Sequence, residues 1–321
     1  MIKRISWKKG MRLTDDLLKM SDEFHSELVH RAFVLAASGR FGLLPSSKPF
    51  HISLNFDKES LEIEELTCSV LTKDGSMIEM DFDTRYSCAY DNKVVLPASD
   101  GSTMLLIAYP SKKGWMDSDE DLIECEYAFS LIPETAVLPD NAFPLSRIVH
   151  HFGWRIDENF VPPCLLLSSH NVYKQLADRF QKTMASVEKN LVESLHADCK
   201  IALAGFWPAV RQLMIDMDKE LDMMTPMQLL ASVQKFISAF ICACMLDPLL
   251  KLSGFEEYDA YTRHPYDYRN VYQRILEGLD LCDSIEEKSS RFSEIVHEEP
   301  APEIVVETPS KSKLRWMGLE I

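Results

Sequence analysis

The sequence predicts an α+β fold in which a β-sandwich-like part precedes an antiparallel four-helix bundle. Two observations lead to this fold class. Before residue 160, apolar and polar residues alternate over short stretches, which is typical of half-buried strands. After residue 170, apolar residues recur every three or four positions, which is typical of amphipathic helices. A run of short strands followed by a run of helices favours an α+β architecture.

The composition is that of a globular chain of about two domains. The chain has 321 residues, and a prior of roughly 150 residues per domain leaves two parts that can each bury a core. The net charge is −16, so most of the surface repels a phosphate backbone. Nucleic acid is therefore a poor candidate partner.

Neither export nor direct membrane insertion is predicted. The first ten residues, MIKRISWKKG, are basic, but no apolar segment follows them. The most apolar helical stretch, residues 236–246, has about half the roughly 20 residues that cross a bilayer. The 8 cysteines lack the regular spacing of a disulfide framework. Reduced thiols and a cytoplasmic location are therefore expected.

One helix is predicted before the strands, over residues 14–39. Thr14 can cap its first turn, and Gly39 can terminate it. Asp15 and Asp16 suit the positive end of the helix dipole. The apolar side chains that would form its stripe are Leu17, Met20, Phe24 and Leu28.

The strands that follow share a period of two, and one pair forms a hairpin. Asp74 and Gly75 supply the positive-φ turn of the hairpin, after which Ile78, Met80 and Phe82 point to one face. Residues 104–109, MLLIAY, are apolar on both faces, as in a central strand. The other predicted strands are residues 52–56, 61–63 and 125–131.

Four helices are predicted after residue 170. Apolar residues between Val172 and Leu195 lie on one helical face. Residues 207–221 form a second helix, in which Pro208 is tolerated near the first turn. A third helix opens at Thr225-Pro226, and Asp247-Pro248 is expected to end or kink it. The fourth covers residues 266–285, and short connections favour an antiparallel bundle.

Cys164 is a candidate for chemistry, because it lies in the stretch FVPPCLLL at residues 160–167. It could pair with His150 or His151 as a thiol nucleophile or a metal site. A buried structural cysteine explains the same residue, since free cysteine is among the most buried residue types. A single Cys/His pairing is no signature, so no catalytic, metal or cofactor-binding residue is predicted. A thiol-reactivity assay separates a cytoplasmic Cys/His enzyme from a structural protein.

Composition divides the chain into three parts. We expect a β-rich shell domain with an N-terminal helix at residues 1–163, a helical bundle at 164–291, and a flexible tail at 292–321. The tail is rich in Pro and Glu and cannot bury enough surface to fold alone. Its tip combines basic and aromatic side chains, which are types common at interfaces. The residues of this tip are Lys313, Leu314, Arg315, Trp316 and Met317.

Several short motifs follow one another in a fixed order along the chain. These are ISWKKGMRL, FGLL, the LTKDGSMIEMDF hairpin, PLSRI, FVPPCLLL and HPYDYRNVY. In this order they resemble the TssK family, the trimeric baseplate subunits of the type VI secretion system, a contractile injection machine. The opening motif resembles the family's Trp-x-x-Gly-Met-x-Leu, and FVPPCLLL resembles its Pro-Pro junction. The likeness covers roughly the first nine-tenths of the chain, and each motif alone is weak.

The resemblance implies a structural protein that is not an enzyme and that needs no cofactor. It implies a homotrimer formed through the helical neck, with the shell bound to the wedge proteins TssF and TssG at the cytoplasmic face of the inner membrane. By the same resemblance, the wedge-binding segment contains Trp7, Gly10, Met11 and Leu13. The interdomain joint between shell and neck contains Pro162 and Pro163.

Two differences from the family affect this expectation. Residues 15–18, Asp-Asp-Leu-Leu, stand where the family has Gln-His-Phe-Gln. The family's C-terminal head, which docks onto the membrane complex, has no counterpart, and the tail stands in its place. We therefore expect the tail tip to dock onto a membrane-complex protein. Besides the Cys/His enzyme, a third possibility is a phage-like tail or receptor-binding structural protein, because a trimer of shell and bundle suits that task as well.

Overall fold

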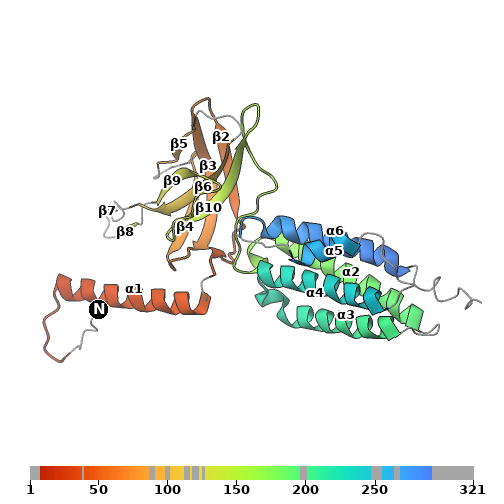
Figure 1. Cartoon of the computed structure of the whole chain (residues 1–321). Helices are drawn as coiled ribbons and strands as arrows, with labels where there is room; N and C mark the ends of the chain where they lie inside the picture. The colour runs from red at the N-terminus through yellow and green to blue at the C-terminus, as the bar shows by residue number, and fades with distance from the viewer. Residues whose placement is uncertain are drawn as a thin grey trace, which may run out of the picture.

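The computed structural model places an N-terminal helix first, then antiparallel strands, and then helices (Figure 1). The α+β class predicted from the sequence is therefore confirmed. The structure describes residues 8–37, 40–86, 91–97, 102–111, 116–117, 123–124, 127–195, 201–246, 255–263 and 268–290.

The first sheet is built around one long strand. β3 (Ser60–Leu71) pairs antiparallel with each of the other members of the sheet. These are β1 (Gly42–Leu43), β2 (His51–Phe56), β4 (Met77–Asp83) and β5 (Lys93–Val95). The predicted hairpin joins β3 to β4, with Gly75 at φ 86°. Ile78 and Met80 are buried and Phe82 is half-buried, which confirms their predicted shared face.

The second sheet has the order β11-β10-β6-β9. Its strands are β6 (Thr103–Pro110), β9 (Tyr127–Pro133), β10 (Phe143–His150) and β11 (Trp154–Ile156). β6 lies between two neighbours, and residues 105–108 are buried on both faces, as predicted for a central strand. A separate two-stranded ladder joins β7 (Met116–Asp117) to β8 (Ile123–Glu124). The predicted strand at 125–131 begins two residues early, and Cys125 lies outside the described residues.

Both sheets contribute to the same apolar core. Leu61 and Ile63 of β3 belong to one cluster of buried side chains together with Leu106 of β6. Phe82 and Phe129 meet across the sheets with their ring centroids 6.3 Å apart. Because this cluster continues into the helices, the sheets and helices share a continuous buried interior.

Among the described residues, five helices follow the sheets (Figure 1). They are α2 (Asn171–Leu195), α3 (Ile201–Glu220), α4 (Pro226–Leu246), α5 (Phe255–Arg263) and α6 (Val271–Ser290). Short 3₁₀ turns, η1 (Leu167–Ser169) and η2 (Leu221–Met223), precede α2 and α4. α2 packs on α3 and α6, while α4 packs on α3, α5 and α6. The predicted apolar face of α2 is buried, including Leu176, Phe180 and Leu191.

Several predicted helix boundaries need correction. α3 begins at Ile201, so Pro208 lies inside the helix and not near its first turn. α6 begins at Val271, five residues later than predicted, and α5 was not predicted at all. The start of α4 is as predicted: Thr225 Oγ1 accepts from Gln228 N at 3.1 Å, and Gln228 Oε1 accepts from Thr225 N at 2.8 Å.

α4 is more apolar, and over a longer stretch, than the sequence prediction supposed. Its window Pro226–Met245 has a mean hydropathy of 1.5, which by length and composition alone would suffice to cross a membrane. Half of this window is buried against the rest of the chain. Leu229, Val233 and Phe236 are fully buried where neighbouring helices pack. A core helix explains this hydropathy.

Candidate functional site

The chain passes from the sheets to the helices through the buried segment 160–164. Leu43 N donates to Pro163 O at 2.8 Å, and Leu165 N donates to Leu43 O at 3.0 Å. These bonds form a short parallel bridge between Leu43 and Cys164. Pro162 and Pro163 are both buried, and each restricts the residue before it to extended geometry. Strand β1 thus holds the predicted joint by its backbone.

Gly42 lets the two backbones approach this closely. A Cβ at this position would lie 2.7 Å from Cys164 C and 2.8 Å from Leu165 N. Its φ of 152° is also one that side-chain-bearing residues rarely adopt. Only glycine fits here without moving the backbone of the joint.

Cys164 is built into the joint as an apolar residue. It is buried, and its Sγ lies 3.4 Å from Pro162 O, which accepts the weak thiol hydrogen bond. Burial raises the pKa of the Cys164 thiol, so the thiol stays protonated at neutral pH. Because the thiolate is the reactive species, this environment opposes nucleophilic chemistry. No group of three His, Cys, Asp or Glu residues that could hold a metal occurs among the described residues.

A second set of contacts crosses the same boundary at residues that the sequence did not single out. The rings of Phe41 and Tyr268 meet edge to face with centroids 5.2 Å apart. Lys73 Nζ lies 5.0 Å from the Phe41 ring centroid and 5.1 Å from that of Tyr268. Arg269 Nη2 donates to Ala136 O at 2.6 Å. The turn before α6 thereby contacts three segments on the sheet side: the one before β1, the β3–β4 turn, and the loop between β9 and β10.

A small apolar cavity of about 280 Å³ lies behind these contacts. Phe41 and Pro163 line it from the sheet side, and Tyr173, Met227 and Tyr268 line it from the helices. The signal for Tyr268 was present in the motif HPYDYRNVY, but the sequence did not show which loop it would meet.

The first turn of α2 completes the joint. Leu167 N donates to Met224 O at 2.8 Å, which ties η1 to η2. His170 Nδ1 accepts from Val172 N at 3.3 Å, and the His170 ring lies 6.1 Å from the ring of Phe50 on the sheet side. Burial lowers the pKa of His170, because the charged imidazolium would lose hydration there.

The predicted wedge-binding segment lies at the other end of a long exposed helix, α1 (Asp15–Ala37). Gly10 has φ 84° and forms a turn with Met11, while Met11 and Leu13 are exposed. Helix α1 has 23 residues and so extends about 35 Å from that segment toward β1. Figure 1 shows it beside the sheets and not packed on them.

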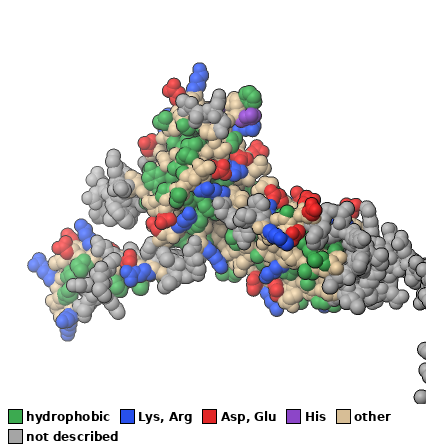
Figure 2. Space-filling model, viewed as in Figure 1, with side chains coloured by type: hydrophobic (Ala, Val, Ile, Leu, Met, Phe, Trp, Pro, Cys, Tyr) green, Lys and Arg blue, Asp and Glu red, His purple; other side chains and the backbone are tan. Residues whose placement is uncertain are grey.

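The apolar side chains of α1 are largely open to solvent. Figure 2 shows hydrophobic side chains on this helix among basic and acidic ones. The predicted stripe is only partly covered: Leu17 and Phe24 are half-buried, whereas Met20 and Leu28 are exposed. Trp7 and the tail tip, Lys313 to Met317, lie outside the described residues. Of the three predicted site regions, the structure therefore describes the joint at Pro162 and Pro163 and, in the wedge-binding segment, Gly10, Met11 and Leu13.

The architecture is that of a protein in which two antiparallel sheets are followed by a group of packed helices. The features described above are the joint between sheets and helices and the exposed apolar side chains of α1. Solved structures of TssK match it over most of the chain. The TssK-TssF-TssG baseplate subcomplex matches with 15% identity and a TM-score of 0.55, covering 89% of this chain and 99% of that one. A crystal structure of TssK matches with 13% identity and a TM-score of 0.57, covering 91% and 69%.

A third structure, TssK of the EAEC type VI secretion system in complex with a nanobody, matches with 17% identity and a TM-score of 0.52 over 84% of this chain and 68% of that one. No family model matches the chain. The curated proteins give no match either. At these identities the likeness shows the fold, and the chain has a TssK-like fold.

Proposed function

We propose that the protein is a structural baseplate component of a type VI secretion system. It acts as a homotrimeric adaptor that links the baseplate wedge to the membrane complex at the cytoplasmic face of the inner membrane. The observation that carries this proposal is the match to TssK through sheets and helices alike, over 89% of the chain in the baseplate subcomplex. The motif order in the sequence supports it independently.

In this proposal the two sheets form a β-sandwich shell and the helices form a four-helix neck. The shell and the N-terminal segment bind the wedge proteins TssF and TssG. The exposed apolar side chains of Met11, Leu13 and α1 support such a role, because an apolar surface open to water stabilises nothing until a partner covers it. The tail tip at Lys313 to Met317 docks onto a membrane-complex protein.

The burial of Cys164 favours a structural role over the Cys/His enzyme considered from the sequence. A nucleophilic cysteine needs an accessible thiolate, whereas this thiol is 9% exposed and its pKa is raised by burial. In this proposal the adaptor holds its two ends at a fixed separation and angle. The rigidity of the joint between sheets and helices determines that angle.

Mass measurement in solution tests the proposal. Light scattering of the purified full chain should give three times the chain mass of 36.8 kDa. Mixing with TssF and TssG wedge proteins should give a larger complex that co-elutes. A stable monomer that binds neither wedge protein contradicts the proposal. A trimer that binds neither favours the phage-like tail protein.

A further inference from the structure

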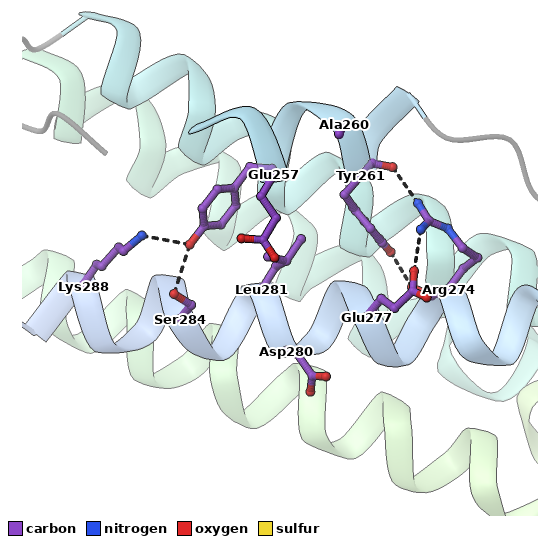
Figure 3. A pocket seen from close by; sticks show the side chains of 10 residues that line it. Glu257, Ala260, Tyr261, Arg274, Glu277, Asp280, Leu281, Ser284 and Lys288 are labelled. Carbon is purple, nitrogen blue, oxygen red and sulfur yellow. Dashed lines mark hydrogen bonds and ion pairs between the residues drawn. The ribbon is translucent and has the colours of Figure 1, made fainter. Parts of the chain in front are cut away.

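A cavity of about 640 Å³ opens between α5 and α6 (Figure 3). It has the size of pockets that bind small molecules or short peptides. Tyr258 and Tyr261 of α5 line one side, and Arg274 and Lys288 of α6 line the other. Neither the sequence motifs nor the proposed baseplate role assigns a function to this groove.

Hydrogen bonds between the two helices preform the groove. Tyr261 Oη donates to Arg274 O at 2.7 Å, and Arg274 Nη2 donates to Tyr261 O at 2.8 Å. Farther along, the Tyr258 hydroxyl lies 3.1 Å from both Ser284 Oγ and Lys288 Nζ. A ligand would therefore meet walls that are already in place, which lowers the entropic cost of binding.

The groove is acidic. Glu257, Glu277 and Asp280 line it. Glu277 pairs with Arg274 at 2.5 Å and Asp280 pairs with Arg179 at 2.7 Å, whereas the exposed Glu257 has no ion-pair partner among the described residues. The sequences of α5 and α6 together hold eight carboxylates and three cationic side chains. This field repels phosphates and nucleotides and attracts cationic groups.

Arg274, in contrast to the carboxylates, favours a ligand that accepts hydrogen bonds. Its side chain is 8% exposed and lines the cavity, and its Nε has no hydrogen-bond partner among the described residues. This Nε is itself buried, and a buried donor without an acceptor is costly. A ligand that shifts this side chain and offers it a carbonyl oxygen would satisfy the donor, while cationic groups of the same ligand meet the carboxylates. A basic peptide does both, because its backbone carbonyls accept hydrogen bonds while its Lys and Arg side chains meet the carboxylates.

We propose that the occupant of this groove is residues 311–317 of the same chain, KSKLRWM. Helix α6 ends at Ser290, two residues after Lys288, so the chain leaves the helix at the end of the groove. Residues 291–310 then connect it to Lys311, and the end-to-end distance of a random coil of that length is roughly 25 Å. Arg274 lies sixteen residues before Ser290, or about 24 Å back along α6. The connection is thus long enough to return the segment along the groove.

The segment has the chemistry that the groove requires. Lys311, Lys313 and Arg315 complement the carboxylates, and Trp316 can pack on the apolar side chains of Leu281 and Ala260 in the groove lining. A tether of this kind gives an effective concentration on the order of 1 mM, so a dissociation constant of about 0.1 mM keeps the groove about nine-tenths occupied. The inference shares the tail with the proposed function but does not depend on it. If both hold, a docking partner must displace the segment from the groove.

Peptide binding to a truncated chain tests the inference. A fluorescent peptide of residues 308–321 is titrated into protein ending at residue 307, with binding followed by anisotropy. We expect saturation with a dissociation constant between about 0.01 and 0.2 mM, and weakening of at least threefold between low and high salt. The full chain should bind the same peptide at least fivefold more weakly, because its own segment competes.

Charge reversal locates the binding. The double substitution Glu257→Lys and Asp280→Lys in the truncated chain should weaken the peptide at least tenfold. The matched control is Asp216→Lys with Glu220→Lys, two exposed carboxylates on α3 that change the net charge equally. Thermal unfolding checks that both variants fold.

Three results would overturn the inference: no binding up to 2 mM peptide, equal weakening by both double variants, or equal affinity of the full and truncated chains. These outcomes concern the isolated protein, so they leave the wedge interaction untouched. Conversely, failure to bind TssF and TssG would remove the proposed function without affecting this result.

Discussion

At the residue scale, His170 couples the start of α2 to protonation. Its Nδ1 accepts a hydrogen bond from Val172 N, which only the neutral ring with an unprotonated Nδ1 can do. Burial lowers its folded-state pKa below the ordinary value of 6.5. A depressed imidazole pKa means that the unfolded chain binds the proton more readily than the folded one. The stabilisation from this residue is therefore full above pH 6.5 and is lost as the pH falls through the folded-state pKa.

Replacement of His170 by Asn should remove this pH dependence, because an amide keeps an acceptor and does not titrate. The free energy of unfolding of the original protein should fall more steeply than that of His170→Asn between pH 7.5 and 5. One proton is worth at most about 1.4 kcal/mol per pH unit, and the half-exposed ring should give less. Urea unfolding at a series of pH values measures the difference. Two parallel curves would contradict the argument.

Cys164 shows how far residue-level reasoning reached from the sequence alone. Proline neighbours and the following leucines favoured a buried thiol, and burial is what the structure shows. What the sequence could not provide was the partner strand. Gly42 lies far away in the sequence, and its contact with the Cys164 backbone depends on chain folding over more than a hundred residues.

At the element scale, the periodicity of apolar residues predicted where helices form but not which neighbours bury them. The stripes on α1 and α2 were both read correctly as helical. The α2 stripe is buried by α3 and α6, but the α1 stripe is partly exposed. A period of 3.6 residues identifies an apolar face and carries no information about what covers it. Helix α5 escaped prediction because nine residues give only two and a half turns of pattern.

Two helical glycines give opposite predictions for the same substitution. A Cβ on Gly278 of α6 would lie 2.6 Å from Tyr261 Cζ and from Val233 Cγ1, whereas a Cβ on Gly205 of α3 meets nothing within 4 Å. Helix propensity favours alanine over glycine by about 1 kcal/mol at either position. Overpacking at Gly278 should outweigh that gain, because it pushes α5 away from α6.

We therefore expect Gly278→Ala to lower the free energy of unfolding by about 1–3 kcal/mol and Gly205→Ala to leave it unchanged or raise it. Chemical denaturation followed by circular dichroism measures both. Equal effects of the two substitutions would show that α5 is not held against Gly278. Peptide binding in the groove should weaken in Gly278→Ala alone.

At the scale of the whole molecule, periodicity predicted the order of strands and helices. It did not predict the contacts that hold the sheets and the helices together. The Phe41–Tyr268 contact and the Arg269 bond to Ala136 join segments that lie far apart in the sequence. Such contacts depend on how two finished layers meet. The prolines at 162 and 163 were informative because their stiffness is local and is set by covalent geometry.

Substitution of both Pro162 and Pro163 by Gly should loosen the angle between sheets and helices. Each change enlarges the unfolded ensemble and should cost about 0.4–1 kcal/mol of stability, and the joint also loses its fixed extended geometry. Distance distributions between spin labels on β5 and α3 should broaden relative to the original protein. The variant can still form both backbone hydrogen bonds of the joint, from Leu43 N to the carbonyl oxygen at position 163 and from Leu165 N to Leu43 O. An unchanged distribution would mean that these bonds and the continuous core alone fix the angle.

Removal of residues 308–321 tests whether the tail carries the outer end of the proposed adaptor. The deletion leaves all described residues in place, including the joint and α1, so the trimer and the wedge complex should form as before. Docking to the membrane complex should be lost, because three weak tails on one trimer act together and none would remain.

Light scattering with TssF and TssG provides the control, and fluorescence localisation of the baseplate with a secretion assay provides the readout. A narrower substitution, Arg315→Glu with Trp316→Ala, should reproduce the loss if the basic and aromatic tip is responsible. Normal recruitment and secretion by both variants would assign membrane docking to another surface of the protein.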